Sequence, residues 1–494
     1  MPPFALRPLW MARLLPVFLL AGCAVGPDYQ APPTAAPAPF RNQALLEQRA
    51  VTGQAADMTQ WWIGFADDGL VTLVNQVLAQ NLDLAQAVAR VSQASALNLS
   101  ARSALLPSGD LNVQASRAHQ SLEDPMGRLA SSAPGYDRNA SLYQVGAGAS
   151  WEVDVFGGLR RQLEAADAEQ QASVAQEAAV RLMVTSSAAR GYIQLRALQA
   201  RQAVVENRVR TQTELVKLMQ LQYAKGVIAR LQLKQAEGVL ATVAAQVPPL
   251  RSAIESTLNS LEVLSGVAPG SLHSTLAVAT AIPTVPGIDT AGGQTQMLRR
   301  RPDVIAAERT LAASNARIGA AVADYYPSFS LGALLGSATT VSGNLLSSDA
   351  NLAQGVLGLR WRLFDFGRVR AEVDYAKGRD AEALAVYQQT LLQATADVET
   401  AMTQLVQSEQ QTALLEAGVT ALTDARTAAY TAYQQGSVSF LEALDADDRL
   451  QQAQEQHLLA QAAAASAAVD CFNALGGGWN APGDVAVSDQ KHRG

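Results

Sequence analysis

Hydrophobic and polar residues alternate in four short stretches of the chain. These stretches comprise residues 111–116, 143–155, 329–335 and 357–363. A period of two is typical of a β-strand with one apolar and one polar face. A loop around Pro125 separates the first two stretches, and a short polar loop around Gly343 separates the other two. The pattern therefore predicts two β-hairpins, within residues 108–156 and 328–366.

Two much longer stretches follow these hairpins and contain no proline. Residues 159–223 and 369–433 each predict one continuous α-helix, which at a rise of ~1.5 Å per residue would reach roughly 100 Å. Gly226 and Gly436 come next, and glycine readily adopts the left-handed conformation that ends a helix. Helical patterns then resume in both halves of the chain. The predicted helical hairpins span residues 159–265 and 367–475.

The two halves of the chain repeat one another. Trp151–Arg160 resembles Trp361–Arg370, and at the same spacing Tyr223–Gly226 resembles Tyr433–Gly436. An internal repeat of this kind indicates two copies of one structural unit. Each unit would carry a leading helix, a strand hairpin and a long helical hairpin. The predicted organisation is a signal peptide (1–22), a Pro/Ala-rich tether (23–60), a first repeat (61–270), a linker (271–292), a second repeat (293–477) and a flexible tail (478–494).

The predicted strands fit a membrane environment. They are about ten residues long, and Glu152, Asp154, Arg360 and Arg362 fall on the polar side of the alternation. A half-buried sheet in a soluble protein is the alternative. Four strands cannot close a barrel, and open strand edges are not tolerated in lipid. If the strands cross a membrane, the chain must therefore oligomerise.

The N-terminus has the order of a lipoprotein signal sequence. Arg7 and Arg13 are basic, the apolar run from Leu14 to Ala21 is too short to span a bilayer, and Leu20–Ala21–Gly22–Cys23 matches a lipobox. Cleavage would make Cys23 the first residue of the mature chain and the site of acylation. Ala24 favours sorting to the outer membrane. An ordinary secretory signal with a chance cysteine is the alternative.

Composition argues against several classes of function. The formal net charge of -7 is spread along the chain, so no basic stripe indicates a nucleic-acid partner. Cys471 is the only cysteine besides Cys23 and predicts a buried core thiol. The four histidines lack the spacing of a metal site. We therefore expect no metal, no cofactor beyond the covalent lipid and no catalytic residues, although an outer-membrane enzyme with a helical scaffold is a third alternative.

Four strings of residues resemble the outer-membrane factor family, the TolC-like exit ducts of tripartite pumps, and in particular its NodT-type lipoprotein branch. They are Cys23–Tyr29, Trp61–Trp62, Leu298–Val304 and Leu363–Arg368. The resemblance implies a mainly α fold with membrane β. Three chains would form a twelve-stranded outer-membrane β-barrel continued by a long periplasmic α-helical barrel. It also implies a homotrimer in contact with outer-membrane lipid, a periplasmic adaptor and an inner-membrane transporter, which we expect to be proton-driven.

The same resemblance assigns roles to the hairpin tips. Tyr223 and Gly226 with Tyr433 and Gly436 would contact the adaptor. Glu442 and Asp445 would form acidic rings at the periplasmic aperture; two solvated helix carboxylates are the alternative. The equivalent residues of the first repeat are neutral, namely Gln232 and Gln235. We expect Arg299, Arg300 and Arg301 to begin a helix and to have structural partners.

The predicted function is passive conduction of drugs or other small solutes out of the cell, from the transporter and adaptor to the exterior. The duct of a type I protein secretion system has the same fold and is the alternative. The lipobox favours efflux.

Overall fold

The structure is a computed structural model that describes residues 24–32, 40–42, 49, 56–288 and 293–480. Cys23, the predicted signal peptide and residues 481–494 lie outside this range. The helices are η2 (Trp61–Phe65), α2 (Asp68–Gln80), α3 (Leu82–Ser103), α4 (Pro125–Ser131), α5 (Gly158–Ala224), α6 (Arg230–Ala244), α7 (Val247–Leu264), α8 (His273–Leu276), α9 (Gly293–Arg300), α10 (Pro302–Ala323), η3 (Ser342–Asn344), η4 (Ser348–Ala350), α11 (Arg368–Gln434) and α12 (Phe440–Ala474). The strands are β1 (Ser108–His119), β2 (Asn139–Val153), β3 (Ser328–Thr339) and β4 (Asn351–Arg360).

The described chain divides into two units. The strand unit contains Ser92–Ala172 and Glu308–Val386 together with residues 24–31. The helix unit contains Ser173–Ala307, the described residues 32–91 and the chain from Tyr387 onward. We describe each unit by itself.

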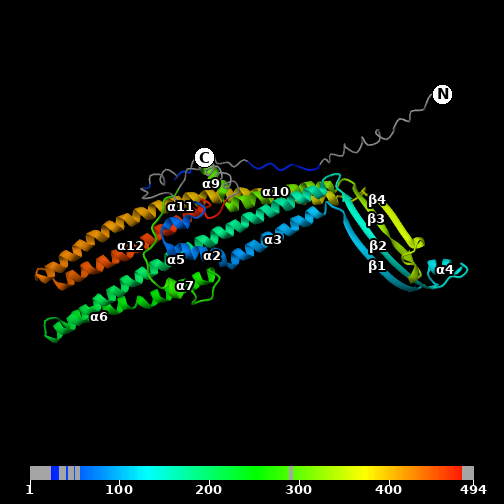
Figure 1. Cartoon of the computed structure of the whole chain (residues 1–494). Coiled ribbons are helices and arrows are strands. Elements are labelled where there is room, and N and C mark those ends of the chain that lie inside the picture. Colours follow the sequence, from blue (N-terminus) through cyan, green and yellow to red (C-terminus); the bar gives the residue numbers. More distant parts are fainter. Residues whose placement is uncertain (1–23, 33–39, 43–48, 50–55, 289–292, 481–494) are drawn as a thin grey trace, which may run out of the picture. The chain divides into compact units, whose positions relative to one another are not determined.

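The strand unit holds one antiparallel sheet in the order β1-β2-β3-β4, as Figure 1 shows. Both hairpins have the same register, because Ser108 lies opposite Ser150 and the repeat-related Ser328 lies opposite Arg360. Strands β2 and β3 join the two hairpins through pairs such as Ala149 with Ala333. The two hairpins of the sheet therefore correspond to the two copies of the internal repeat. Every residue of β1 is exposed on this single chain.

Two details of the strand unit differ from the prediction. The alternation predicted that β4 continues through Leu363, but the strand ends at Arg360. Asp365 accepts hydrogen bonds from the backbone N–H groups of Gly367 and Val369, which caps α11 and turns the chain out of the sheet. The loop between β1 and β2 contains the unpredicted helix α4, which Asp124 caps through the N–H of Gly127 at 2.7 Å.

The helix unit contains most of both helical hairpins, α5 with α6 and α7, and α11 with α12, and the first turns of α5 and α11 belong to the strand unit. Within the first helical hairpin, predicted over residues 159–265, the returning segment is two helices, α6 and α7, because the chain breaks at Ala245 and Gln246. Pro248 and Pro249 follow at the start of α7. Proline has no N–H to donate and disfavours helical conformation in the residue before it. The second repeat lacks these prolines, and α12 runs unbroken.

Aromatic side chains are among the most deeply buried residues of the helix-unit core. Trp61 is fully buried and stacks on Phe472 at a centroid distance of 5.4 Å and an interplanar angle of 8°. Cys471 is also fully buried, as predicted, and burial raises the pKa of its thiol to about 12. The tail predicted to be flexible from residue 478 is packed through Trp479, which is 9% exposed.

The predicted tether is also bound where it is described. Phe40 is buried, and the carboxylate of Glu399 on α11 accepts the backbone N–H groups of Arg41 and Asn42. Arg49 forms an ion pair with Glu409 at 2.6 Å, farther along the same helix. These residues therefore lie along α11.

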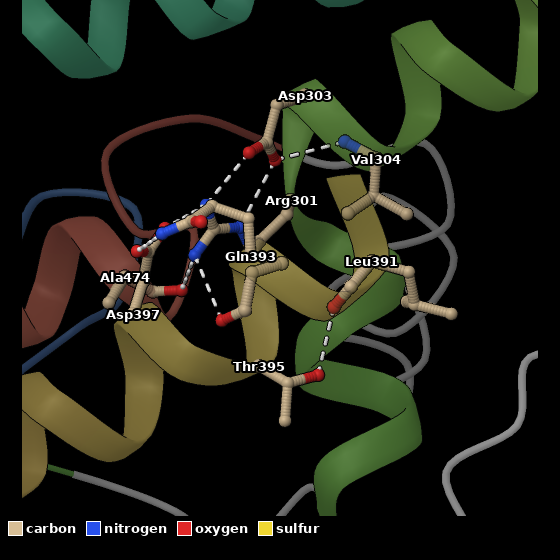
Figure 2. A network of polar contacts seen from close by, with 9 residues as sticks. Arg301, Asp303, Val304, Leu391, Gln393, Thr395, Asp397 and Ala474 are labelled. Atoms are coloured by element: carbon tan, nitrogen blue, oxygen red, sulfur yellow. Dashed lines mark hydrogen bonds and ion pairs between the residues drawn. The ribbon is translucent and has the colours of Figure 1, made fainter. Parts of the chain in front are cut away.

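Arg301 links the start of α10 to α11 and to the end of α12 within the helix unit. It lies between α9 and α10, and Figure 2 shows its guanidinium surrounded by oxygen atoms. It donates to the carboxylates of Asp303 at 2.7 Å and Asp397 at 3.1 Å, and to the carbonyl oxygen of Ala474 at 3.0 Å. In the first repeat, Asn81 donates to the equivalent carbonyl oxygen, that of Leu264, at 2.8 Å. Arg301 thus has the structural partners we expected, although at a helix junction.

None of the helices in the described ranges is both long and apolar enough to cross a lipid bilayer.

Candidate functional site at the helical-hairpin tips

Both hairpins turn through the same backbone motif. Gly226 and Gly436 have φ angles of 72° and 75°, in the left-handed region that glycine adopts at no steric cost. In the first tip the N–H of Gly226 donates to the carbonyl of Tyr223 and the N–H of Val227 donates to that of Gln222, both at 2.9 Å. The second tip repeats these bonds. The pattern is a Schellman motif, so both predicted helix ends are confirmed.

The helices that leave the two tips begin differently. In α12 the hydroxyl of Ser439 accepts the N–H of Glu442 at 3.3 Å, and the Glu442 carboxylate accepts the N–H of Ser439 at 2.7 Å. This reciprocal pair is a capping box. In α6 only one of the two capping bonds is present. Gln232 accepts the N–H of Ala229 at 3.0 Å, but alanine has no hydroxyl that could accept the second bond. Glu442 therefore stabilises its own helix end.

The structure places both predicted gate residues on the exposed side of α12. Glu442 and Asp445 are exposed, whereas the neighbouring Ala443 is buried. Asp445 forms an ion pair with Arg449 one turn along, at 2.8 Å. Both carboxylates thus lie near the tip with a local partner on this chain, and their role at an aperture stays a prediction.

The predicted contact residues of the tips differ in their surroundings. Tyr223 is 43% exposed, and Val227 and Leu231 beside it are more exposed still. Tyr433 in the second tip packs against Phe440 at a centroid distance of 5.0 Å. Leu441, the repeat equivalent of Leu231, is 70% exposed, so the first tip is the more open one only at Tyr223 and Val227.

Ion pairs join the two hairpins along α5 and α12. We call these three pairs, which sequence reasoning missed, the arginine ladder. The pairs are Arg190 with Asp470, Arg201 with Glu455, and Arg208 with Asp448. The arginines recur at near multiples of 3.6 residues, which places them on one face of α5. That spacing was the available signal, but it does not say which helix would supply the acids.

The last pair of the ladder lies in a polar region that is incompletely hydrogen-bonded. Arg208 Nε, Gln212 Oε1 and Gln451 Oε1 are buried and have no hydrogen-bond partner among the described residues. Buried polar atoms normally find partners, and each one that lacks them is costly. The contact between the hairpins near the tips is therefore polar and weaker than an apolar core.

A cavity of about 330 Å³ lies beside this contact, between α5 and the second hairpin. Leu215 and Leu218 of α5 line one side, and Tyr430 and Phe440 of the second hairpin line the other. Arg426 of α11 borders it and donates to Asp447 of α12 at 3.2 Å. The two hairpins thus leave an open pocket between them at this level.

The described residues hold no group of three or more His, Cys, Asp or Glu side chains placed to bind a metal ion.

Comparisons with known proteins extend these observations. A model of the family described as outer membrane efflux protein matches residues 73–267 and 294–477. The outer-membrane channel OprN is 31% identical, with a TM-score of 0.81 over 92% of this chain and 100% of that chain. The open state of the Neisseria gonorrhoeae MtrE outer membrane channel is 25% identical, with a TM-score of 0.79 over 93% and 99%.

Three relatives match this chain over most of their length. The pyoverdine export outer membrane protein OpmQ of Pseudomonas putida is 30% identical over 473 residues, 95% of this chain and 97% of that protein. The cation efflux system protein CusC of Escherichia coli is 28% identical over 479 residues, with 94% and 99% covered. Nodulation protein T of Rhizobium leguminosarum bv. trifolii is 28% identical over 442 residues, with 87% and 89% covered.

These matches confirm the predicted fold class, the outer-membrane location with extension into the periplasm, and the role of an efflux channel. The matched proteins are transport proteins and not enzymes. With most of its length matched by the family model, this chain belongs to the outer membrane efflux protein family.

Proposed function

We propose that the chain forms a homotrimeric exit duct of a tripartite pump. Its hairpin tips contact a periplasmic adaptor, an inner-membrane transporter supplies the energy, and an acyl group on Cys23 anchors each copy. The observation that carries the proposal is the sheet, whose outer strands β1 and β4 each have one unpaired edge in the described chain. Unpaired edges are not tolerated in lipid, so copies of the chain must close the sheet.

The internal repeat gives the register in which two copies would meet. Strand β2 pairs with β3 through Ala149 and Ala333. The repeat-related strands are β4 and β1, and the equivalent residues are Leu359 and Val113. We therefore expect Leu359 of one copy opposite Val113 of the next.

Exposed side chains near the strand ends support this arrangement. Phe156, just after β2, stacks on Tyr326, just before β3, at a centroid distance of 4.6 Å. The repeat-related residues are Phe366 after β4 and Leu106 before β1. Phe366 is fully exposed and Leu106 is 63% exposed. In the trimer, Phe366 of one copy and Leu106 of the next would cover one another at the boundary between the two copies.

A disulfide test checks the register. Cysteines replacing Val113 and Leu359 should form an intermolecular disulfide on mild oxidation, because opposed residues in antiparallel strands lie within the Cα separation that a disulfide requires. Denaturing gels without reductant should show dimers and trimers and nothing larger. The matched control combines Val113→Cys with Gly358→Cys, which point to opposite faces and should not cross-link. Efficient cross-linking of the control alone, or bands beyond a trimer, would contradict the proposal.

Small solutes are the proposed cargo. Pyoverdine export and cation efflux are the printed roles of two relatives, and both concern small solutes. Those roles support efflux of drugs or similar molecules over secretion of proteins. Deletion of the gene should raise drug or metal sensitivity without changing the secreted proteins.

The exposed apolar residues of the first tip support adaptor contact there. Tyr223, Val227 and Leu231 together offer a surface that an apolar partner helix could cover. The second tip, with Tyr433 packed on Phe440, would serve the gate. We propose a proton-driven transporter as the partner.

Glu442 and Asp445 should make the tips selective for cations. Three copies of each carboxylate near the aperture would raise the local cation concentration. Changing both to alanine should lower cation selectivity and weaken block by multivalent cations added on the periplasmic side, as read by single-channel recording. The charge-preserving pair Glu442→Asp with Asp445→Glu is the control. Unchanged selectivity and block would leave Glu442 as a capping residue only.

A further inference from the structure

We infer that a groove of the strand unit seats the N-terminus of the mature chain, and that Arg161 in this groove positions the acyl group. We call the groove the anchor seat and define it by Gly157 and Arg161 at the start of α5 and by Glu308 and Gly319 on α10. The inference rests on the proposed function in one respect, namely that Cys23 is the acylated residue.

Arg161 binds two residues of the segment that follows Cys23 in the sequence. Its side chain is 5% exposed, and its guanidinium donates to the carbonyl oxygen of Val25 at 3.2 Å and to the carboxylate of Asp28 at 2.6 Å. The N–H of Val25 donates to the carbonyl oxygen of Phe156 at 3.1 Å. Both backbone groups of Val25 are therefore held by the strand unit, two residues from the acylation site.

Close backbone contacts show that the segment fits tightly. Gly26 has a φ of 92°, and a Cβ added to it would lie 2.4 Å from the Cα of Gly319. A Cβ on Gly319 would in turn lie 2.9 Å from the side chain of Arg161, and one on Gly157 would lie 2.7 Å from the Cα of Ala24. A larger residue at Gly26 or Gly157 would force the backbone to shift, and one at Gly319 would force the side chain of Arg161 to move.

Tyr29 ends the seated segment. Its hydroxyl donates to the carboxylate of Glu308 at 2.6 Å, and the guanidinium of Arg309 lies 5.9 Å from the centre of its ring. The seated segment thus extends from Ala24 to Tyr29, with polar contacts at both ends.

The second copy of the groove lacks these features. Helices α3 and α10 have equal lengths, as do α5 and α11, so equivalent positions are unambiguous. The repeat places Ala371 where Arg161 stands, Leu99 where Gly319 stands and Val88 where Glu308 stands. Alanine offers no guanidinium, and leucine would fill the space that Gly26 occupies. The anchor seat is therefore specific to the first repeat and the N-terminus.

The seat fixes where the lipid enters the membrane. Ala24 touches Gly157, shortly after β2 ends at Val153. Cys23 is the residue that precedes Ala24 in the sequence. Trp151 and Trp361 near the strand ends are exposed and donate their indole N–H groups to backbone carbonyls, as amphipathic residues at a membrane interface do. The acyl chains would therefore begin at the level of these tryptophans.

The seat also orders the steps of maturation. If residues 24–29 were seated first, signal cleavage between Gly22 and Cys23 would have to occur two residues from a backbone group that is bound to the strand unit. Proteases act on extended, accessible chain. Acylation and cleavage must therefore precede seating of Ala24–Tyr29.

Hydrogen exchange and mass spectrometry on the purified, full-length mature protein test the inference. The Val25 amide should be protected in the wild type and exchange at least about tenfold faster in Arg161→Gln, because the guanidinium hydrogen bonds to Val25 and Asp28 are lost. Arg317→Gln is the matched control, because Arg317 pairs with Glu169 between the same two helices without touching the N-terminus. Asp28→Asn, at an exposed side chain, gives a second test that leaves both helices intact and should also raise the exchange rate.

A photoreactive palmitate incorporated in the cell reads the position of the lipid. In the wild type and in Arg317→Gln, cross-links should concentrate on peptides that contain the strand ends near Val153 and Tyr326. In Arg161→Gln the cross-links should be spread over many peptides. Fast exchange at Val25 in an acylated wild-type protein, or the same cross-links in all variants, would overturn the anchor seat alone. An N-terminal peptide whose mass shows no acyl group would instead overturn the proposed lipid anchor.

Discussion

Replacing Arg301 by methionine is expected to lower the free energy of unfolding by about 2–4 kcal/mol. The side chain is 10% exposed and pairs with Asp303 and Asp397, which are each about half in water. Methionine would leave both carboxylates without their cation and the carbonyl of Ala474 without its donor. Urea titration of the detergent-purified protein, followed by far-UV circular dichroism, measures the loss.

Two further variants separate the buried charge from general packing. Arg449→Met removes an arginine from an exposed pair with Asp445 and should cost less than about 1 kcal/mol. Adding Asp397→Asn to Arg301→Met should restore part of the stability, because it removes one of the uncompensated charges. If Arg301→Met and Arg449→Met were equally mild, the network in Figure 2 would not hold the helix junction together.

The long helices were predictable to within one residue at each end. The prediction of 159–223 compares with α5 at Gly158–Ala224, and that of 369–433 compares with α11 at Arg368–Gln434. Their signals are local, since proline is absent throughout and glycine follows each end. The strand hairpins were also predictable, because alternation is a local pattern. Their joining through β2 and β3 was not, because alternation says which face a residue occupies and not which strand lies beside it.

Local signals that competed with a broader pattern were misread. Pro248 and Pro249 were visible in the sequence, yet no separate helix beginning at them was predicted. Ser439 and Glu442 have the spacing of a capping box, and Glu442 was assigned only to the gate. In both cases the local chemistry of the backbone decided the structure.

Contacts between distant segments could not be predicted. Arg161 meets Asp28, and Arg208 meets Asp448, across long separations in sequence. A single arginine in a helix carries no sign of its partner, and only the fold brings the two charges together. The anchor seat and the arginine ladder therefore emerged from the structure.

The arginine ladder leads to the second large effect, an increase in the fraction of time the channel is open when Arg208 is replaced by alanine. Of the three pairs, the one between Arg208 and Asp448 has the least exposed arginine. The side chain of Arg208 is 14% exposed. Removing it leaves Asp448 without its cation in a region that already contains unpartnered polar atoms. We expect a loss of about 1–3 kcal/mol per copy, discounted because Asp448 is 31% exposed.

A loss of this size shifts a two-state equilibrium between closed and open tips about five- to 150-fold. The effect would be larger if the three copies of the proposed trimer opened together, because their contributions would add. Single-channel recording should therefore show Arg208→Ala open for a much larger fraction of time than the wild type. Arg210→Ala is the matched control, since Arg210 is exposed and donates to the neutral side chain of Asn207.

Exchanging the two charges distinguishes a specific ion pair from a general loss of packing. The combination Arg208→Asp with Asp448→Arg keeps one acid and one base between α5 and α12, and it should recover much of the closed population if their attraction holds the hairpins together. Each single reversal places like charges together and should open the tips more than alanine does. If all of these variants conducted like the wild type, the hairpins would be held closed by contacts between copies, because the ladder lies within one chain and would then contribute nothing to the gate.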